Sequence, residues 1–334
     1  MRTKERIHTI DLLRGIAIFL VVFGHITHNQ TLRTYIWGFH IPIFFFISGL
    51  LFKRQKFASF CDFFKSRIKS IVLPYVVFYL VTLVYWILIE RHYRGVDVSI
   101  DSQLIGLVYG TYDLRYMMFN GALWFIPCLF SIEILYWFIS KCINRVCRFG
   151  ALIICNAVGL YLINRVPWLP WGVCAAFIGV VFYGLGDFFK PLFIGKTAIS
   201  FGTYIYIYVI ALFLLQLALF PCTGADLASL YIGNKWLYIP IATTGILLYW
   251  LIATIIKSNK VLEYLGINSL VIFAFQEPTY RAVIFVASKI IGYSVAEVRN
   301  SFFLCIIITI CSIIVITPLI VLWNKRVKPL INRI

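Results

Sequence analysis

Long apolar runs, separated by short polar segments, dominate the chain. Runs of roughly 20 hydrophobic residues recur along its whole length, and an α-helix needs about that many to cross a bilayer. The runs are continuous and do not alternate between apolar and polar residues, so they favour membrane helices over a β-barrel. We therefore predict an all-α, polytopic integral membrane protein, a single domain over residues 1–334, with about ten spanning helices. The predicted ranges are 9–28, 35–52, 71–89, 118–140, 150–165, 172–189, 199–220, 236–256, 268–288 and 301–323.

Composition and charge add an orientation to this picture. The chain is 62% hydrophobic and only 13% charged, a larger apolar share than soluble domains have. With a cytoplasmic N-terminus, 20 of the 30 Lys and Arg residues lie in predicted cytoplasmic segments and 8 in outer segments. This distribution fits the positive-inside rule with both termini in the cytoplasm. The net charge of +17 therefore indicates orientation and contact with anionic lipids of the bilayer, and we expect no nucleic-acid partner.

The first predicted span, TIDLLRGIAIFLVVFGH, carries three ionisable side chains that a simple membrane crossing does not need. Asp11 and Arg14 are three residues apart and share a helix face. Arg14 and His25 are eleven residues apart, so they also share a face, at a separation of roughly 16 Å. Such side chains at membrane depth commonly mark function, although a structural Asp11–Arg14 pair and a packed histidine are alternatives. Because histidine suits proton transfer near neutral pH, we predict His25 as a general base, with Arg14 and Asp11 as catalytic candidates.

A basic segment, FFKSRIKSIVLPY, leads into the third predicted span. It contains Lys65, Arg67 and Lys69. These residues form either a positive-inside cluster or a binding site for a phosphate-rich cytosolic ligand, since the guanidinium fork suits phosphate oxygens.

Other spans also carry polar side chains. His40 in the second span could line the same cavity as His25 or lie at the membrane interface. Trp124 and Glu133 belong to the fourth span, where a tryptophan can also serve in an aromatic belt. Glu277 and Arg281 in the ninth span are four residues apart and are predicted to pair. We found no cysteine and histidine spacing typical of a metal site, so no metal is expected.

Together these segments resemble the membrane acyltransferase group known as acyltransferase 3, and within it the branch of fucose 4-O-acetylases and related acetyltransferases. Arg14 and His25 are similar to the R-x10-H motif of that family. The segments FHIPIFFFISGLLF, SRIKSIVLPY, LWFIPCLF and YLGINSLVIFAFQEP resemble further parts of it. The family often has a histidine where this chain has Gln276, and two arginines where it has Lys69 and Ser70.

The resemblance implies transfer of an acyl group, usually acetyl from acetyl-CoA, to a hydroxyl of a cell-surface sugar. The acceptor would be a surface glycan such as O-antigen or capsule, or a lipid-linked oligosaccharide, and the enzyme would lie in the bacterial cytoplasmic membrane. We expect the outer segment 90–117 to select the sugar. The residues expected to hold the phosphates of acetyl-CoA are Arg14, Arg67, Lys69 and Lys65. Those expected in the acceptor site are His40, Trp124, Glu133 and Glu277.

Two other classes of protein stay open from the residues alone. A transporter or flippase for a lipid-linked glycan would also place charges inside the membrane, and it would work without an acyl donor. A non-catalytic scaffold would tolerate alanine at Arg14 and His25. The residues also leave open direct transfer or a covalent relay through His25, and a monomer or a homo-oligomer.

Overall fold

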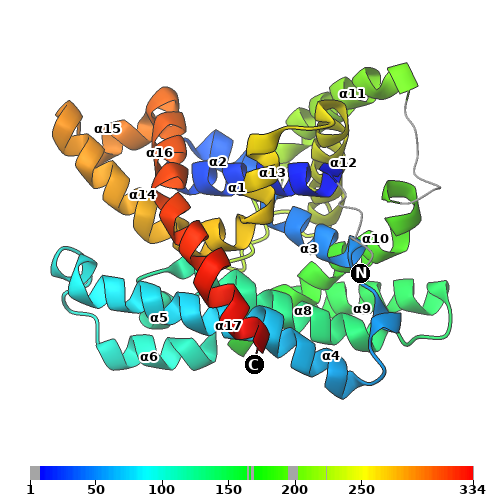
Figure 1. The fold of residues 1–334 in the computed structure, drawn as a ribbon. Coiled ribbons are helices and arrows are strands. Elements are labelled where there is room, and N and C mark those ends of the chain that lie inside the picture. Colours follow the sequence, from blue (N-terminus) through cyan, green and yellow to red (C-terminus); the bar gives the residue numbers. More distant parts are fainter. Residues whose placement is uncertain (1–7, 164, 167–168, 195–201, 223, 334) are drawn as a thin grey trace.

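In the residues that it describes, the computed structural model consists of helices joined by turns and loops, and the β-structure there is one isolated bridge between Asp226 and Tyr231 (Figure 1). The described residues are all except 1–7, 164, 167–168, 195–201, 223 and 334. Nine helical segments in this part of the chain are long and apolar enough to cross a membrane. The prediction of a polytopic, all-α membrane protein is therefore confirmed. The long helices are α1 (His8–Ile26), α5 (Leu73–Leu88), α8 (Phe125–Ile139), α9 (Arg145–Ile163), α10 (Val173–Phe193), α11 (Ile205–Leu219), α12 (Tyr238–Ile256), α14 (Ser269–Ile291) and α16 (Phe302–Leu322).

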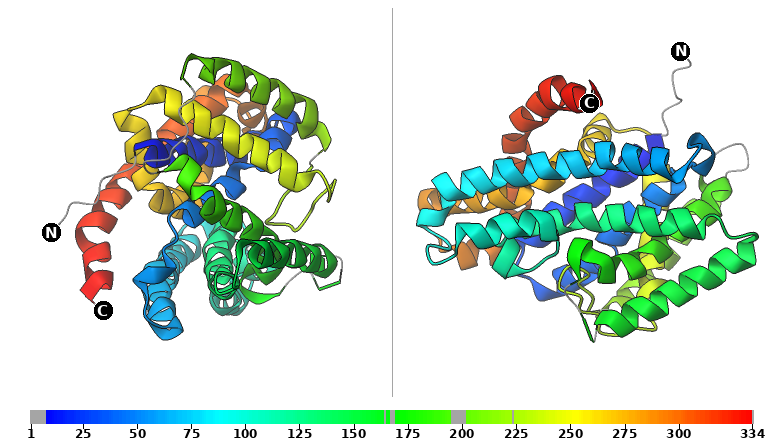
Figure 2. Two further views of the ribbon diagram at one scale, coloured as in Figure 1. Left: turned by 90° about the vertical axis from the view of Figure 1, so that its right-hand side faces the viewer. Right: turned by 90° about the horizontal axis from the view of Figure 1, so that it is seen from below.

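Shorter helices connect or extend the long ones. They are α2 (Gln30–Trp37), α3 (His40–Leu50), α4 (Phe60–Arg67), α6 (Ile100–Tyr109), α7 (Leu114–Met117), α13 (Lys260–Ile267), α15 (Val295–Asn300) and α17 (Lys328–Arg333). The outer segment predicted over 90–117 thus contains two helices of its own, α6 and α7. Figure 2 (left) shows α11 and α17 at the periphery of the bundle.

The prediction of a continuous second span over 35–52 is wrong. The chain forms α2 and α3 instead, and the helix breaks at Phe39, whose φ of −140° and ψ of −15° lie outside the helical region. Pro42 lies in the first turn of α3, where its missing N–H needs no helical partner. Each helix alone is too short to cross a bilayer, but in sequence they carry the chain from the end of α1 back toward its beginning.

The third span begins earlier than predicted. A capping box of Ser59 and Asp62 starts α4, because each residue satisfies a backbone N–H at the helix start. A π-helical turn, Ile68–Val72, then joins α4 to α5 in one helical segment of 29 residues, Phe60–Leu88. The basic segment is therefore helical, and its three cations have different surroundings, as described below.

The central helix is α1, which packs against α2, α3, α12, α13, α14 and α16. Its contact with α13 is made backbone to backbone. A Cβ added at Gly15 would lie 2.0 Å from the carbonyl oxygen of Leu262, and one at Gly266 would lie 1.9 Å from that of Asp11. Glycine at both positions permits this close approach, as small residues commonly do between membrane helices. The stripe that carries Arg14 and His25 is thus enclosed by protein.

Hydrogen bonds gather the predicted cytoplasmic segments at one end of the bundle, to the right in Figure 1. Lys190 Nζ at the end of α10 donates to the carbonyl of Phe52 at 2.6 Å, and Arg54 Nη1 donates to the carbonyl of Ser140 after α8 at 2.9 Å. We call this the inner end.

The predicted outer segments meet at the opposite end, which we call the outer end. Arg299 in α15 donates to the carbonyl of Ile26 at 2.8 Å, and Trp171 Nε1 donates to the carbonyl of Val108 at 2.9 Å. The arrangement agrees with the alternation of loops expected from the distribution of basic residues.

Candidate active site

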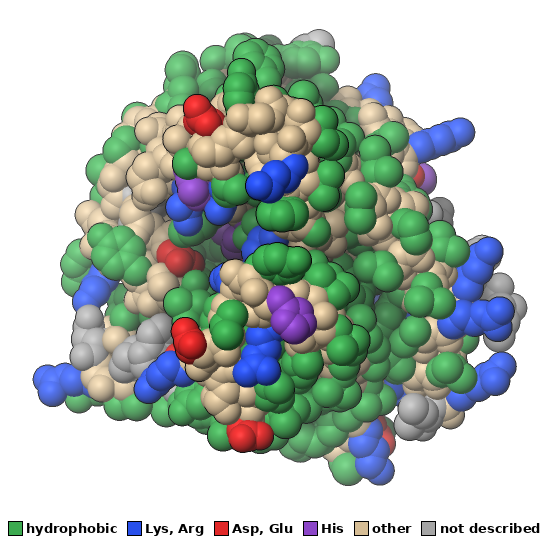
Figure 3. Space-filling view, turned by 90° about the vertical axis from the view of Figure 1, so that its left-hand side faces the viewer, with side chains coloured by type: hydrophobic (Ala, Val, Ile, Leu, Met, Phe, Trp, Pro, Cys, Tyr) green, Lys and Arg blue, Asp and Glu red, His purple; other side chains and the backbone are tan. Residues whose placement is uncertain are grey.

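The last turn of α1 opens into a cavity of about 180 Å³ at the outer end, which we call the outer cavity. Four side chains that sequence analysis placed in the site come together here: His25, His40, Trp124 and Glu277. They come from α1, α3, the turn before α8, and α14, so only the tertiary fold unites them. The face at this end is hollowed, and histidine, basic and acidic side chains gather around the hollow (Figure 3).

The two histidines of the outer cavity are held differently. His40 Nδ1 lies 3.0 Å from the carbonyl oxygen of Ile36. Because a carbonyl can only accept, Nδ1 carries the proton, and in the neutral ring Nε2 is left as an acceptor. The ring of His25 lies beside that of Trp37, with centroids 6.1 Å apart. The cavity therefore offers one imidazole with a fixed tautomer and a second one next to it on the central helix.

Glu277 is fixed by donors on both carboxylate oxygens. Arg281 Nη1 donates to Oε1 at 2.7 Å, which confirms the pair predicted from their spacing. The backbone N–H of Ala122 donates to Oε2 at 2.9 Å. Arg281 also donates to Glu90, on the outer segment, at 3.0 Å. The carboxylate thus faces the cavity in one orientation and links α14 to two outer segments.

Sequence analysis missed Arg299, which closes the outer end of α1. Its Nη2 donates to the carbonyl of His25 at 2.7 Å and its Nε to that of Ile26 at 2.8 Å. The carbonyl of Arg299 accepts in turn from the N–H of His28 at 2.9 Å. These are carbonyls that a helix C-terminus leaves without intrahelical partners, and a cation is favourable there. Burial lowers the pKa of the Arg299 guanidinium, which nevertheless stays charged. Arg299 therefore fixes the backbone that carries His25.

Sequence analysis named none of three further residues that line the outer cavity: Arg33, Asp226, and Tyr112, which lies in the outer segment expected to select the sugar. The guanidinium of Arg33 lies 4.1 Å from the ring centroid of Trp37, close enough for a cation–π contact. Burial raises the pKa of the Tyr112 phenol, and the carboxylates of Asp226 and Glu277 raise it further, so this hydroxyl stays a donor. One signal was available: Arg33 and Arg299 are basic residues on the side where basic residues are scarce.

A second, larger cavity of about 790 Å³ lies at the inner end, and we call it the inner cavity. Asp11 and Arg14 on α1 line it together with Arg67 and Glu133. Arg67 Nη1 and Glu133 Oε2 form an ion pair of 2.9 Å. Glu133 was expected in the acceptor site beside His25. It lies instead two and a half helical turns along α8 from Trp124, which puts it at the opposite end. Three lysines, Lys53, Lys56 and Lys190, also line this cavity.

Two of the predicted phosphate-binding residues lie elsewhere. Lys69, on the π-helical turn, donates through Nζ to the carbonyl of Asn332 in α17 at 2.7 Å. Lys65 is exposed on α4, and neither lysine lines the inner cavity. The basic segment therefore contributes only Arg67 to this cavity.

The same three helical segments line both cavities. On α1, Arg14 lines the inner and His25 the outer cavity, and Trp124 and Glu133 divide in the same way along the segment of α8. On α3, His40 lies at the outer cavity, while Ser48 and Leu50 line the inner one. At a rise of 1.5 Å per residue, the two sites are about 12–16 Å apart along these helices. Each of these three segments therefore runs from one cavity to the other.

Gln276 occupies the position where the resembling family often has a histidine. It is fully buried in α14, and neither of its side-chain polar atoms has a hydrogen-bond partner among the described residues. It does not line the outer cavity, whereas its neighbour Glu277 does.

The fold and these cavities define a class: an integral membrane protein in which polar sites at the two ends of one central helix lie inside a helical bundle. The sequence model of the acyltransferase 3 family, described as an acyltransferase domain, matches residues 7–320. The chain therefore belongs to the acyltransferase 3 family and is an acyltransferase. Searches among curated proteins and among solved structures found no match.

Proposed function

We propose that this protein is a membrane-bound O-acetyltransferase that uses acetyl-CoA and a glycan acceptor. The donor enters the inner cavity from the cytoplasm, with both chain termini on that side. The acceptor, a cell-surface glycan or a lipid-linked oligosaccharide, enters the outer cavity of an enzyme in the bacterial cytoplasmic membrane. The observation that carries the proposal is that Arg14 and His25 line different cavities bounded by the same three helices.

The inner cavity has the charge that a coenzyme A thioester needs. Arg14 and the lysines Lys53, Lys56 and Lys190 present cations toward it, and Arg67 is already paired with Glu133. Phosphate groups favour such a site because each charge-assisted contact is stronger than a neutral hydrogen bond. The pantetheine arm is long and thin, so the acetyl group can reach toward His25 between α1, α3 and α8.

At the outer cavity, His25 acts as the general base. It takes the proton of the acceptor hydroxyl while the oxygen attacks the thioester carbonyl. The resulting oxyanion is stabilised by the cation of Arg33, which lines this cavity. Collapse of the tetrahedral intermediate forms the ester and breaks the C–S bond, and the imidazolium of His25 returns the proton to the thiolate of coenzyme A. Glu277, His40 and Trp124 orient the sugar through hydrogen bonds and apolar contact.

The experiment compares His25→Ala with His28→Ala in full-length protein. His28 is an exposed histidine three residues away that does not line the cavity, so it is a matched control. Labelled acetyl transfer from acetyl-CoA should fall by about 10²–10⁴-fold in His25→Ala, the usual contribution of a general base, and stay near wild type in His28→Ala. NMR of surface polysaccharide from cells with and without the protein identifies the acceptor through its acetyl resonance. Normal acetylation by folded His25→Ala protein would refute the role of His25, and glycan movement without any acyl donor would favour a transporter.

A further inference from the structure

A second pocket lies beside the inner cavity and differs from it in charge. It has a volume of about 450 Å³ and shares Phe52, Lys53 and Lys190 with the inner cavity, so the two adjoin. Three separate segments build it: the chain after α3, the turn after α8 together with the first turn of α9, and the end of α10. We call it the basic pocket, after the five cations that line it: Lys53, Arg54, Arg145, Arg148 and Lys190.

The positive charge of the basic pocket is largely uncompensated. Asp187 is the one carboxylate among its described lining residues, and it accepts a hydrogen bond from the hydroxyl of Tyr136 at 2.7 Å. Within the described ranges, none of the five cations forms an ion pair with a carboxylate. Like charges confined to one partly enclosed pocket repel one another, and an anion between them relieves this repulsion.

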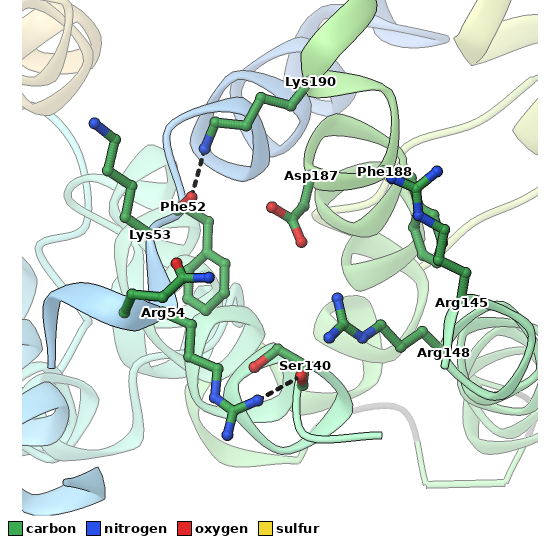
Figure 4. A pocket seen from close by; sticks show the side chains of 10 residues that line it. Phe52, Lys53, Arg54, Ser140, Arg145, Arg148, Asp187, Phe188 and Lys190 are labelled. Carbon is green, nitrogen blue, oxygen red and sulfur yellow. Dashed lines mark hydrogen bonds between the residues drawn. The ribbon is translucent and has the colours of Figure 1, made fainter. Parts of the chain in front are cut away.

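The pocket is held in shape by its own cations. Lys190 and Arg54 are fastened to backbone carbonyls, those of Phe52 and Ser140. Figure 4 shows both contacts, and it shows Arg148 pointing toward the centre of the pocket from the side opposite Phe52. The positive-inside rule explains why these loops contain basic residues. It does not explain why the basic residues of three separate segments converge on one cavity.

Phe188 adds an aromatic surface to the basic pocket. Figure 4 shows Phe188 and Arg145 on the same side of the pocket, opposite Phe52. A purine base stacks readily on such a ring and on a guanidinium plane, and stacking tolerates any base. The combination of phosphate-binding cations with an aromatic face fits a nucleotide better than it fits a lipid headgroup.

We infer that the basic pocket binds the phosphorylated nucleotide end of the acyl donor, with Arg145 and Arg148 contacting its phosphates. This rests on the proposed use of acetyl-CoA. The nucleotide lies in the basic pocket, and its diphosphate extends past Phe52, Lys53 and Lys190, so that the pantetheine arm enters the inner cavity beside the cations there. The same phosphate chemistry could come from an anionic lipid headgroup, and the experiment separates the two sources.

The experiment uses full-length protein in detergent micelles and the double variant Arg145→Gln/Arg148→Gln. Arg145 is exposed and Arg148 is half-buried in the first turn of α9, and neither belongs to the buried face of this helix, so their replacement spares the core. The matched control is Lys325→Gln/Arg326→Gln, an exposed pair of equal charge near the C-terminus that lies outside the basic pocket. Calorimetry with adenosine 3′,5′-bisphosphate measures nucleotide binding without any reaction. Kinetics compare kcat/KM for acetyl-CoA with kcat/KM for acetylpantetheine, which lacks the nucleotide.

In the double variant, the Kd for the bisphosphate should rise about tenfold, and the preference for acetyl-CoA over acetylpantetheine should fall by a similar factor. The control should match the wild type in both. Unchanged binding and preference in the double variant would overturn the inference. So would a double variant that keeps nucleotide binding but loses bound phosphatidylglycerol by native mass spectrometry, because the pocket would then be a lipid site. If wild type transfers acetyl from neither donor, the proposed function fails, whereas the calorimetry still tests the pocket.

Discussion

Replacing Arg299 with methionine tests whether the backbone that carries His25 must be held from outside α1. The change removes two hydrogen bonds, from Nη2 to the carbonyl of His25 and from Nε to that of Ile26. A hydrogen bond with a charged partner contributes about 1.5–3 kcal/mol. Because Arg299 is only half-buried, we take the lower end and expect a loss of about 2–3 kcal/mol at this helix terminus.

The kinetic effect follows from position. A catalytic group displaced by about 1 Å can lose about 10²-fold in rate, so we expect kcat of Arg299→Met to fall between about 10- and 100-fold. The KM for acetyl-CoA should stay within about twofold, since the donor enters about 16 Å away along α1. Arg299→Lys should recover part of kcat, because an ammonium group can reach one of the two carbonyls but lacks the guanidinium fork.

The assay is acetyl transfer to the acceptor by purified protein, with thermal unfolding in detergent as a check on folding. Arg165→Met is the matched control, because Arg165 is also an outer arginine but is exposed. Its guanidinium lies 5.7 Å from the ring centroid of Tyr161, away from the outer cavity. A folded Arg299→Met protein with wild-type kcat would refute the positioning role. If Arg299→Met instead raised the KM for acetyl-CoA and left kcat unchanged, Arg299 would be assigned to donor binding.

Three further predictions concern the inner half of the molecule. Arg14→Ala should raise the KM for acetyl-CoA about tenfold and leave the KM for the acceptor nearly unchanged, because Arg14 lines the inner and not the outer cavity. Steady-state kinetics with each substrate varied in turn measures both values, and an unchanged KM for acetyl-CoA would show that the donor binds elsewhere. Glu133→Leu should lower the free energy of unfolding by about 3 kcal/mol, because it leaves the guanidinium of Arg67 without its carboxylate partner. Thermal unfolding of Glu133→Leu and of the wild type measures the difference in stability. Gly266→Ala should reduce the yield of folded protein on size-exclusion chromatography, because its Cβ would lie 1.9 Å from the carbonyl oxygen of Asp11, whereas Gly150→Ala, with no atom within 4 Å, should behave as wild type.

The sequence predicts what is periodic or local in this protein. The apolar runs predict the long helices, and a spacing of four predicts the Glu277–Arg281 pair, which is observed at 2.7 Å. The prediction of a continuous second span was wrong because a hydropathy profile does not detect a break in the backbone. The relevant signals were Gly38 and Pro42, which lie on either side of Phe39, where the helix stops. Helix boundaries elsewhere moved by several residues because amphipathic extensions such as α4 are too polar to count as apolar runs.

Sites built between helices were harder to predict. The spacing of Arg14 and His25 places them on one face of α1, but it does not say that they line two cavities. Glu133 was assigned to the wrong end because Trp124 and Glu133 are close in sequence, although the helix between them separates them by about 14 Å. Arg299 could not be assigned at all, because its partners lie more than 270 residues away, at His25 and Ile26.

The separation of the two cavities also bears on how the acyl group avoids water. Phe45 stands between the inner and outer ends of α3, and its ring stacks on that of Phe125 with centroids 5.3 Å apart. Phe125 contacts Phe273, which lines the outer cavity, at 4.9 Å. Aromatic rings at this level make the surroundings of α1, α3 and α8 apolar, and for the proposed donor such surroundings would exclude water from the thioester. Under the proposed function, the charged ends attract the two polar substrates from opposite sides, and the apolar middle admits the thin pantetheine arm with its acetyl group. Substituting Phe125 with serine should therefore raise hydrolysis of acetyl-CoA relative to transfer, whereas an unchanged ratio of hydrolysis to transfer would show that this aromatic layer does not control water.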